Sequence, residues 1–469
     1  MGYNSGMGVA IKPVYRVGVL GLGREGIDTL KFLNAAGLKP IGLDGRELAI
    51  FAWPVQRQIK RLTSELRLGP NYLAEINDLD IVFRSPGVPL NLPLLKKAKR
   101  RGVVMSSLMQ IFFELCPAKI IGVTGTKGKS TTVNLIYHLL KNQLPGRVYL
   151  GGNVGKPVLT LLPKLTKKDW VTLELSSFQL EDLKLSPHIS VLLNVSPEHL
   201  DRHHQFKKYF DAKSNIFVHQ SKKDWLISSS DHLLTRAVLH KTKGKTFAYS
   251  THKILPKGLY AMGGEIIYRH PKTKRRVVLC QRSQIPLLGE HNFENALAAI
   301  GVALLAGVKP AVVARRLVKF KSLPHRLELV GVINKTQFIN DSMATTPIAT
   351  MAALNTATEP VAVIIGGVSK RESLTELIQS LNNSRVNGIV LIGRSTPRLK
   401  REFKLARLRT PYTAAADLTK AVELAYRYVK SEGTVLLAPA FASFDMFKDA
   451  YDRGDQFRKI AKELIKQHK

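Results

Sequence analysis

The sequence predicts an α/β protein of three domains with mostly parallel sheets. Short apolar strands alternate with helical segments along nearly the whole chain, which is the pattern of parallel sheets covered by helices. Two of these strands run directly into a glycine-rich turn that opens a helix. The 469 residues are too many for one ordinary core and suggest about three domains. We expect these domains at residues 1–107, 108–322 and 323–469.

The first domain begins with a strand, a glycine-rich turn and a helix. The strand covers residues 17–20, the G-x-G-x-x-G turn runs from Gly21 to Gly26, and the next strand, residues 40–43, ends at Asp44. A third strand over residues 81–83 leads into a proline-rich turn. Taken alone, this strand–turn–helix pattern with Asp44 predicts a dinucleotide site in a Rossmann-like domain. The same geometry serves other nucleotide diphosphates, and many α/β domains that have it bind none.

The second domain contains the most informative motif, the run GTKGKST over residues 125–131. An apolar strand precedes it and a helical pattern follows over residues 133–140. Glycine N–H groups and a helix N-terminus can converge on phosphate oxygens, Lys129 can reach the terminal phosphates, and the Ser130 hydroxyl can ligate Mg²⁺. The loop is not a strict Walker A sequence, because Val123 stands where its first glycine would be. We expect a site for ATP or a similar nucleotide.

The rest of the chain continues the α/β rhythm. Strands of the second domain are expected over residues 170–175, 189–194 and 225–228. Residues 247–288 change to short strands and turns, which predicts a small antiparallel patch, and a helix over residues 292–305 follows. The third domain is also predicted to be Rossmann-like, with strands over residues 338–340, 361–365, 388–392 and 435–437.

Two side chains after the phosphate loop could hold a metal ion. Glu174 lies in an apolar strand, where an unpaired carboxylate costs several kcal/mol and a cation would offset that cost. An ion pair with a structural Arg or Lys is the alternative. His199 follows the next strand, at the sheet edge where parallel sheets place their sites. It lies close to His203 and His204, so a surface histidine cluster is equally compatible with the sequence.

Lys213 falls on a stripe that should be buried. The helical segment around it places apolar residues at Phe206, Phe210 and Phe217, and Lys213 shares their face. Either its amine reaches solvent along the helix surface, or it is a modified or active-site lysine.

Composition excludes several classes of protein. No apolar run approaches the roughly 20 residues of a membrane helix and the first residues lack a signal-peptide core, so we expect a soluble, cytoplasmic protein. Cys116 and Cys280 provide neither a disulfide framework nor a zinc site. The 71 Lys and Arg exceed the 35 Asp and Glu, for a formal charge of +36. Because this charge is dispersed, we favour a basic solvated surface with weak, nonspecific polyanion binding over a specific nucleic-acid site.

Together these pieces closely resemble the Mur ligases, and among them the members that add D-glutamate. The resemblance covers nearly the whole chain. Its most specific passages are GTKGKST, GGNVG (residues 151–155), LELSSFQLE (173–181), NVSPEHLDR (194–202), YFDAK (209–213), GEHNFEN (289–295), LPHRLE (323–328), NDSMAT (340–345) and APAFASFDMF (438–447). The Asp-Asn-Pro-Arg signature expected of the relatives that add diaminopimelate or lysine is absent.

The resemblance implies an ATP-dependent amide ligase of peptidoglycan precursor synthesis, with UDP-N-acetylmuramoyl-L-alanine, D-glutamate and ATP as substrates, two Mg²⁺ ions, and a monomeric chain. The implied ATP site consists of Gly125, Thr126, Gly128, Lys129, Ser130, Thr131, Asn292, Asn295, Arg326 and Asp341. The implied metal ligands are Ser130, Glu174, His199 and Lys213, the last as a carbamate formed with CO₂; Lys129, Glu174, His199 and Lys213 would be catalytic.

The resemblance also assigns the two other substrates. The UDP-sugar would meet Arg24, Glu25, Arg46, Ser85, Pro86, Gly87, Asn153 and Ser176, so the turn at Gly21 would serve UDP and not NAD. The D-glutamate pocket would contain Thr345, Lys370, Ser443 and Phe444.

Four residues depart from the family pattern. Met343 stands where a lysine is usual, Lys127 where asparagine is frequent, and Val368-Ser369 where Asp-Gly is customary. A Mur-like or folylpolyglutamate-type ligase with another acceptor therefore remains an alternative. From other classes, an NAD-dependent oxidoreductase would use the turn at Gly21 and Asp44, and a polyanion-binding protein would use the basic surface.

Overall fold

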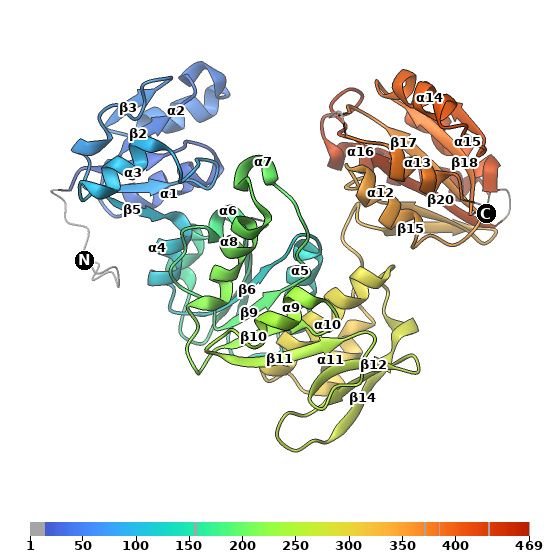
Figure 1. Cartoon of the computed structure of the whole chain (residues 1–469), viewed down its shortest axis with the longest axis horizontal. Coiled ribbons are helices and arrows are strands. Elements are labelled where there is room, and N and C mark those ends of the chain that lie inside the picture. The colour runs from blue at the N-terminus through green and yellow to red at the C-terminus, as the bar shows by residue number, and fades with distance from the viewer. Residues whose placement is uncertain (1–14, 154–156, 370–371, 384, 430–431, 469) are drawn as a thin grey trace. The chain divides into compact units, whose positions relative to one another are not determined.

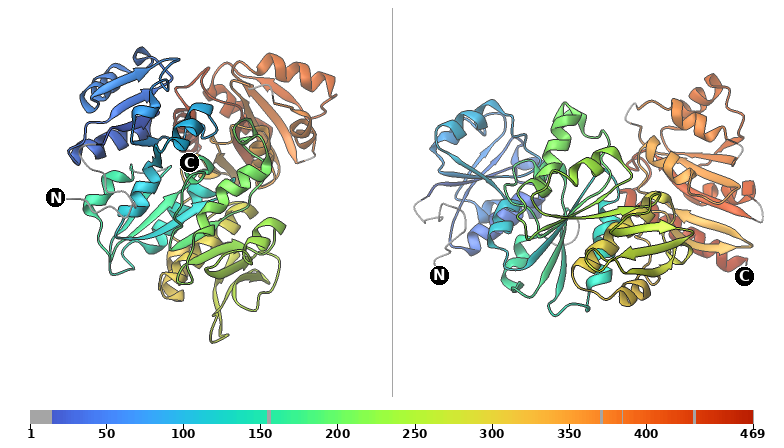
Figure 2. Two further views of the ribbon diagram at one scale, coloured as in Figure 1. Left: turned by 60° about the vertical axis from the view of Figure 1, so that its left-hand side comes forward. Right: turned by 60° about the horizontal axis from the view of Figure 1, so that its bottom comes forward.

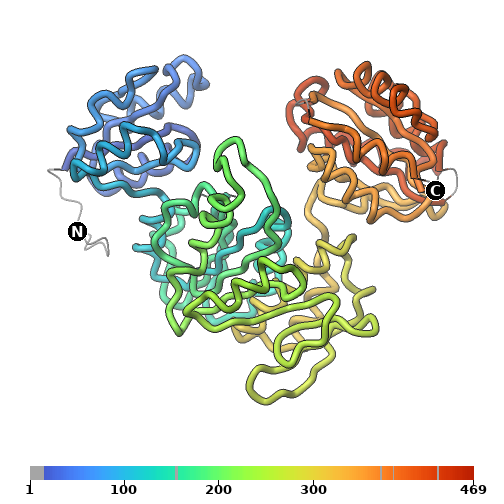
Figure 3. The backbone as a smooth tube through the Cα atoms, viewed as in Figure 1, coloured from blue at the N-terminus to red at the C-terminus, as the bar shows by residue number. Residues whose placement is uncertain are grey.

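The computed structural model describes residues 15–468 apart from 154–156, 370–371, 384 and 430–431. Packing divides the chain into two compact units. The first unit runs to Gln284 and includes Glu294–Val318, and it contains two sheets. The second unit consists of Ile285–Phe293 and the chain from Lys319 onward, and it contains one sheet. Figure 3 traces the chain through the three sheets in sequence order.

The first sheet has five parallel strands in the order β3-β2-β1-β4-β5 (Figure 1). The strands are β1 (Val17–Leu20), β2 (Ile41–Asp44), β3 (Glu65–Leu68), β4 (Ile81–Arg84) and β5 (Val104–Ser107). The helices are α1 (Arg24–Ala35), α2 (Trp53–Leu62), α3 (Pro93–Arg100) and α4 (Leu108–Leu115). Every residue of β1, β2 and β4 is buried, as expected of central parallel strands covered on both faces. The turns after β1 and β4 therefore meet at one edge of the sheet.

The middle sheet has nine strands in the order β14-β13-β12-β11-β10-β9-β6-β8-β7 (Figure 2). The parallel strands are β6 (Lys119–Thr124), β7 (Val148–Gly152), β8 (Trp170–Glu174), β9 (Ile189–Leu192), β10 (Trp225–Ser229), β11 (Lys245–Ser250) and β12 (Gly258–Met262). The antiparallel patch adds β13 (Glu265–Arg269) and β14 (Arg276–Gln281) to β12. The helices are α5 (Lys129–Leu140), α6 (Ser177–Leu180), α7 (Leu200–His203), α8 (Phe206–Val218), α9 (Leu233–Val238), α10 (Glu290–Leu305) and α11 (Pro310–Leu317).

The third sheet has six strands in the order β15-β16-β20-β17-β18-β19, all parallel except the pair β15 and β16. The strands are β15 (Glu328–Ile333), β16 (Thr336–Asn340), β17 (Val361–Gly366), β18 (Val386–Ile392), β19 (Tyr412–Ala414) and β20 (Gly433–Ala440). The helices are α12 (Pro347–Leu354), α13 (Thr375–Leu381), α14 (Thr396–Leu405), α15 (Leu418–Val429) and α16 (Ala450–Gln467).

Alternation along β17 places this sheet between two layers of helices. Val361, Val363 and Ile365 belong to one core cluster, which includes residues of α12, α13 and α14. Ala362 and Ile364 belong to another, which includes residues of α15 and α16. Successive side chains of a strand point to opposite faces, so each face of the sheet has its own core.

The predicted fold class is confirmed: three α/β parts, mostly parallel, with one small antiparallel patch. The basic run at residues 269–276 spans the turn between β13 and β14. Some boundaries were wrong. The helix after the phosphate loop begins at Lys129, four residues before the predicted start, and the strand expected to reach residue 194 ends at Leu192. Among the described residues, no helix is both long enough and apolar enough to cross a membrane.

Candidate functional site

The phosphate loop lies between strand β6 of the middle sheet and the start of α5. Gly128 adopts φ +86° at the N-cap of α5, and a β-carbon there would approach Asn295 Oδ1 to 2.2 Å. Glycine is therefore required on two counts: backbone conformation and close approach. Asn295, on α10, thus lies directly against the loop. Thr126 ties the loop to the segment after β9 by donating its hydroxyl to Ser196 O at 2.9 Å and its N–H to Asn194 O at 2.9 Å.

Lys129 lies at the first turn of α5 and bends back into the loop. Its Nζ donates to Gly125 O at 2.9 Å and to Thr126 O at 2.8 Å. The ammonium therefore lies among the loop residues, where a terminal phosphate could accept its hydrogen bonds in place of the carbonyls. Ser130 and Thr131 follow on the same helical turn.

Glu174 ends β8 and pairs with Val123 of β6, one strand from the loop. Its side chain is buried, with 2% of the residue exposed. Oε1 accepts a hydrogen bond from Asn153 Nδ2 at 2.9 Å, whereas Oε2 is buried without a hydrogen-bond partner in the described part of the chain. In the described part of the chain no ion pair is formed by Glu174, although the amine of Lys213 is near enough for its charge to interact with that carboxylate. The structural ion pair considered as an alternative is thus absent there, and a buried carboxylate oxygen without a partner fits a cation.

Lys213, on α8, is fully buried at 1% exposure. Its Nζ donates to Gly125 O at 2.9 Å and to Thr124 Oγ1 at 3.4 Å, and lies 4.6 Å from the centre of the Tyr209 ring. Burial, aided by the nearby charge of Lys129, lowers the pKa of Lys213 to about 7. The amine does not reach solvent, so of the two interpretations the active-site one fits. A neutral amine fraction near pH 7 is the form that can react with CO₂.

His199 occupies the N-cap of α7 with φ +55°. Its side chain is 47% exposed, and its Nε2 lies 3.8 Å from Glu198 Oε2. Glu198 also pairs with Lys127 of the phosphate loop at 2.5 Å. His203 is not a surface residue: it is buried, with Nε2 at 3.1 Å from Ser177 Oγ. The interpretation as a surface histidine cluster is therefore wrong for His203.

Within the described residues, no group of three His, Cys, Asp or Glu side chains is arranged to hold a metal ion. The expected set of Ser130, Glu174, His199 and Lys213 contains only one carboxylate and one imidazole. Lysine becomes an oxygen ligand only as a carbamate, and ATP phosphates would supply further oxygens.

A cleft of about 560 Å³ opens at the edge of the first sheet. It is lined by six of the residues expected at the UDP-sugar: Arg24, Glu25, Arg46, Ser85, Pro86 and Gly87. Asn153 reaches the same cleft from the middle domain, and the lining also includes Asp28, Leu108 and Met109, which were not expected there. Ser176 does not line it; its hydroxyl caps α6 by accepting the N–H of Gln179.

Asp44 and Arg46 form a closed pair inside this cleft. Arg46 Nε and Nη2 donate to the two carboxylate oxygens of Asp44 at 2.9 and 2.7 Å, and the Leu22 N–H donates to Oδ2 at 2.7 Å. Although burial opposes it, these hydrogen bonds hold the pKa of Asp44 below its usual range. The carboxylate that a dinucleotide site would offer to a ribose is therefore already occupied.

Glu25 links the two domains of the first unit. Its Oε1 accepts from Gln179 Nε2 at 2.7 Å, and burial raises the pKa of Glu25. The link extends the capping box at Ser176 across to the glycine turn.

In the second unit, the segment after β16 carries several of the expected residues. Asp341 accepts the Leu327 N–H at 3.2 Å, and burial raises the pKa of Asp341 to about 6. Arg326 lies near enough to act on that carboxylate. Thr345 is partly buried, Ser443 is buried, and Phe444 is 72% exposed. Lys370 lies outside the described residues.

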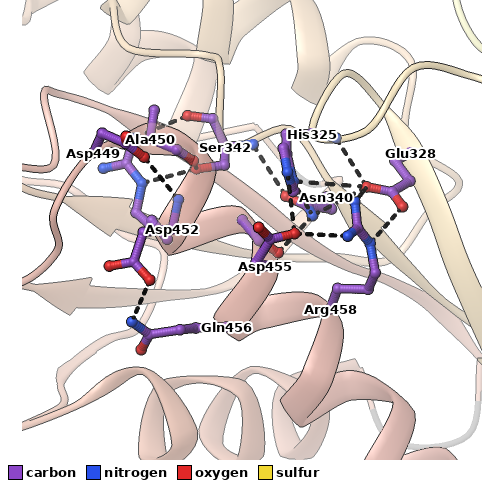
Figure 4. A network of polar contacts seen from close by, with 12 residues as sticks. His325, Glu328, Asn340, Ser342, Asp449, Ala450, Asp452, Asp455, Gln456 and Arg458 are labelled. Atoms are coloured by element: carbon purple, nitrogen blue, oxygen red, sulfur yellow. Dashed lines mark hydrogen bonds and ion pairs between the residues drawn. The ribbon is translucent and has the colours of Figure 1, made fainter.

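A buried polar network holds this segment in place (Figure 4). Asn340 Nδ2 donates to Gly454 O at 2.9 Å and lies 3.0 Å from His325 Nδ1. Arg458 donates to both carboxylate oxygens of Glu328, at 2.8 and 3.0 Å. Arg453 is fully buried and donates to Ser342 Oγ at 3.0 Å and to Ser342 O at 2.9 Å. α16 thus fixes the segment that bears Asp341.

Comparison with known proteins agrees with this geometry. The sequence matches the N-terminal domain of MurD-like Mur ligases over residues 15–107, the Mur ligase middle domain over 123–303, and the Mur ligase glutamate ligase domain over 325–441. It is 36% identical over 458 residues to the UDP-N-acetylmuramoylalanine–D-glutamate ligase of Acetivibrio thermocellus, covering 96% of both chains. The chain belongs to the Mur ligase family.

Other Mur ligases are similar over their full length. The enzyme of the same name from Symbiobacterium thermophilum is 34% identical, covering 97% of this chain and 99% of that one. Among solved structures, MurF of Thermotoga maritima in complex with ADP has a TM-score of 0.57 at 17% identity, and MurC of Thermotoga maritima has 0.56 at 18%. They cover 98% and 96% of this chain, and 98% and 100% of their own. At these identities the two structures show the shared Mur ligase fold.

Sequence reasoning missed three groups of residues in this Mur ligase. Asp28, Leu108 and Met109 line the cleft but carry no motif. Arg84 and Arg202 contact main-chain carbonyls, which leave no mark in a sequence. Gly454, the partner of Asn340 on α16, lies 114 residues away in the sequence. The sequence signal for this contact was the polar character of Asn340 at the end of a buried strand.

Proposed function

We propose that this Mur ligase uses ATP to join D-glutamate to UDP-N-acetylmuramoyl-L-alanine in peptidoglycan precursor synthesis. The observation that carries the proposal is the near-full-length similarity, at 32–36% identity, to relatives named for that reaction. The phosphate loop, the unpartnered oxygen of Glu174 and the cleft at the first sheet supply the matching chemistry.

Each domain takes one substrate in this proposal. Residues 1–107 hold the UDP-sugar, residues 108–322 hold ATP, and residues 323–469 hold D-glutamate. Arg24, Glu25, Arg46 and the Ser85–Gly87 turn line the cleft for the first, with Asn153 and Ser176 directed to the muramoyl end. Thr345, Ser443, Phe444 and Lys370 form the acceptor pocket, since hydroxyls and a lysine suit a dicarboxylate.

The residues present fit Mg²⁺. Glu174 offers a buried carboxylate oxygen, Ser130 a hydroxyl, His199 a half-exposed imidazole, and Lys213 a nitrogen that becomes a carbamate. A divalent cation bound there would polarise the γ-phosphate and offset its charge. Asn153 keeps Glu174 oriented by its hydrogen bond to Oε1.

The reaction has two steps. The alanyl carboxylate oxygen attacks the γ-phosphorus of ATP, and the bond from that phosphorus to the β,γ-bridging oxygen breaks. ADP is the leaving group, and the product is an acyl phosphate. The amine of D-glutamate then attacks the acyl carbon, phosphate leaves, and the amine loses a proton. Lys129 and the loop N–H groups hold the phosphates, Asn292 and Asn295 lie at the adenine, and Arg326 and Asp341 bind phosphate and ribose. Most of the catalysis is positioning and charge stabilisation.

Phosphate release with ATP, Mg²⁺ and UDP-N-acetylmuramoyl-L-alanine tests the proposal. D-glutamate, L-glutamate, D-aspartate, L-lysine and meso-diaminopimelate are compared as acceptors. Selective stimulation by D-glutamate is expected. Stimulation by another acceptor would keep the ligase and change its substrate, and phosphate released equally without UDP-sugar and acceptor would refute the scheme.

A further inference from the structure

The turn Ser85–Val88 after β4 has two different sides. On one side, all four of its residues line the cleft of the first sheet. On the other, its four carbonyl oxygens accept hydrogen bonds from two side chains of the described residues, Arg84 and Arg202. Arg84 Nη1 donates to Val88 O at 2.6 Å, with longer contacts to Ser85 O at 3.4 Å and Pro86 O at 3.5 Å. Arg202 donates to Gly87 O at 2.8 Å and to Pro86 O at 2.9 Å.

Arg84 is anchored in the middle domain. Its side chain is 1% exposed and ion-paired with Asp182, whose Oδ2 accepts from Nε at 2.9 Å and from Nη2 at 2.8 Å. Nη2 also donates to Phe178 O at 3.3 Å. A buried guanidinium with a carboxylate partner and several carbonyl acceptors is held in one geometry. Arg84 therefore fixes the turn against α6.

Arg202 connects the same turn to the segment that carries His199. It belongs to α7, a helix of four residues whose N-cap is His199. The Arg202 guanidinium lies 5.0 Å from the centre of the Phe178 ring, and the His199 ring lies 5.1 Å from the same ring. So short a helix has almost no stability of its own. Its position depends on these contacts and on the hydrogen-bond contact of His203 with Ser177.

We infer that Arg202 is a positioning residue that couples occupancy of the UDP-sugar cleft to the nucleotide and metal site through α7 and His199. A ligand that orders the Ser85–Val88 turn also orders the carbonyls that hold Arg202, and thereby His199, which lies three positions before Arg202 at the N-cap of α7. Each ligand then favours the arrangement that the other requires, so the coupling acts equally in both directions. This inference rests on the proposed function, because it takes the cleft as the UDP site and His199 as a metal ligand.

The coupling is measured by calorimetric titration, without catalysis. UDP-N-acetylmuramoyl-L-alanine is titrated into the full chain with and without Mg²⁺ and a non-hydrolysable ATP analogue. For the native protein we expect nucleotide to tighten UDP-sugar binding by about 5-fold or more, as in typical allosteric pairs. In Arg202→Gln this ratio should fall to about 1, with nucleotide binding alone little changed. Lys207→Ala, an exposed residue on the neighbouring helix α8, is the matched control and should keep the native ratio.

Phe178→Leu provides a second variant that leaves Arg202 in place and removes the ring between it and His199; its ratio should fall as well. A native ratio in both Arg202→Gln and Phe178→Leu would overturn the inference, as would a native protein that binds both ligands independently. A native protein that binds neither ligand would instead refute the proposed function. Thermal unfolding of each variant shows whether it is folded, and should Arg202→Gln not fold, Phe178→Leu alone decides.

Discussion

Replacing Lys213 by methionine should remove a large pH dependence from the stability of this chain. The buried amine has a pKa of about 7 in the folded protein, against 10.5 for an unhindered lysine. Between these values the unfolded chain holds a proton that the native amine has lost, so the free energy of unfolding of the native protein rises with pH. At about 1.36 kcal/mol per pH unit, the whole interval corresponds to about 5 kcal/mol. The part between about pH 6 and pH 9 is about 2–3 kcal/mol.

Methionine fills a similar volume and carries no proton in either state. The difference in free energy of unfolding, Lys213→Met minus native protein, should therefore be largest near pH 6 and fall by about 2–3 kcal/mol toward pH 9. Urea unfolding in carbonate-free buffer at a series of pH values measures it, and differences from all other titrating groups cancel between the two proteins. Lys207→Met, whose side chain is 83% exposed, should show a difference that does not vary with pH.

A flat difference for Lys213→Met would mean that the amine keeps an ordinary pKa in the fold, and the argument from burial would be wrong. The same pair of proteins tests the carbamate. With ¹³C-labelled bicarbonate near pH 8, the native protein should show a carbamate carbon signal in the NMR spectrum that Lys213→Met lacks. In that reaction the neutral nitrogen attacks CO₂, one C=O pair moves to oxygen, and the nitrogen loses its proton to water.

Three other substitutions test the site. Glu174→Gln should lower Mg²⁺-dependent phosphate release by roughly 100-fold or more. Its thermal stability should be unchanged or raised, because an amide replaces a buried carboxylate whose Oε2 has no described partner. A fully active variant would exclude Glu174 as a ligand. Gly128→Ala should lower the free energy of unfolding by at least about 1–2 kcal/mol and prevent nucleotide binding. The reason is that φ of Gly128 is +86° and the added β-carbon would meet Asn295. Native binding of a fluorescent ATP analogue would contradict this. Ser85→Ala removes a 2.6 Å hydrogen bond from the Ser85 hydroxyl to Gly21 O. It should lower the free energy of unfolding by about 1 kcal/mol and weaken UDP-sugar binding measured by calorimetry. Unchanged affinity would show that the turn does not need this hydrogen bond.

Local patterns predicted those parts of the site whose reason lies in a single segment. The stripe of Phe206, Phe210 and Phe217 placed Lys213 on a face expected to be buried, because helical periodicity decides which side chains share a face. It left open whether the amine reaches solvent, and the structure shows that Lys213 is buried. Glu174 was identified in the same way, as a charge within an apolar strand. The phosphate loop followed from its glycines and its place between strand and helix.

Other parts depend on what the rest of the fold brings to a residue. Asp44 follows a strand as a ribose-binding carboxylate would, but Arg46 occupies both of its oxygens. The clamp of Arg84 and Arg202 acts on carbonyl groups, which every residue possesses, so no residue type reveals it. The short strands β3, β5 and β19 have partly exposed residues and too few positions for a period to be recognised.

The network around Asn340 has a consequence for synthesis of the chain on the ribosome. Ser342 and Asn340 obtain their partners from Arg453 and Gly454, 111 and 114 residues later, and Glu328 obtains Arg458 after 130. Until α16 has been translated, the segment that bears Asp341 lacks these buried contacts. The phosphate loop, by contrast, depends on residues no further along than Asn295. A nascent chain should therefore form an ordered phosphate loop well before it forms an ordered third sheet.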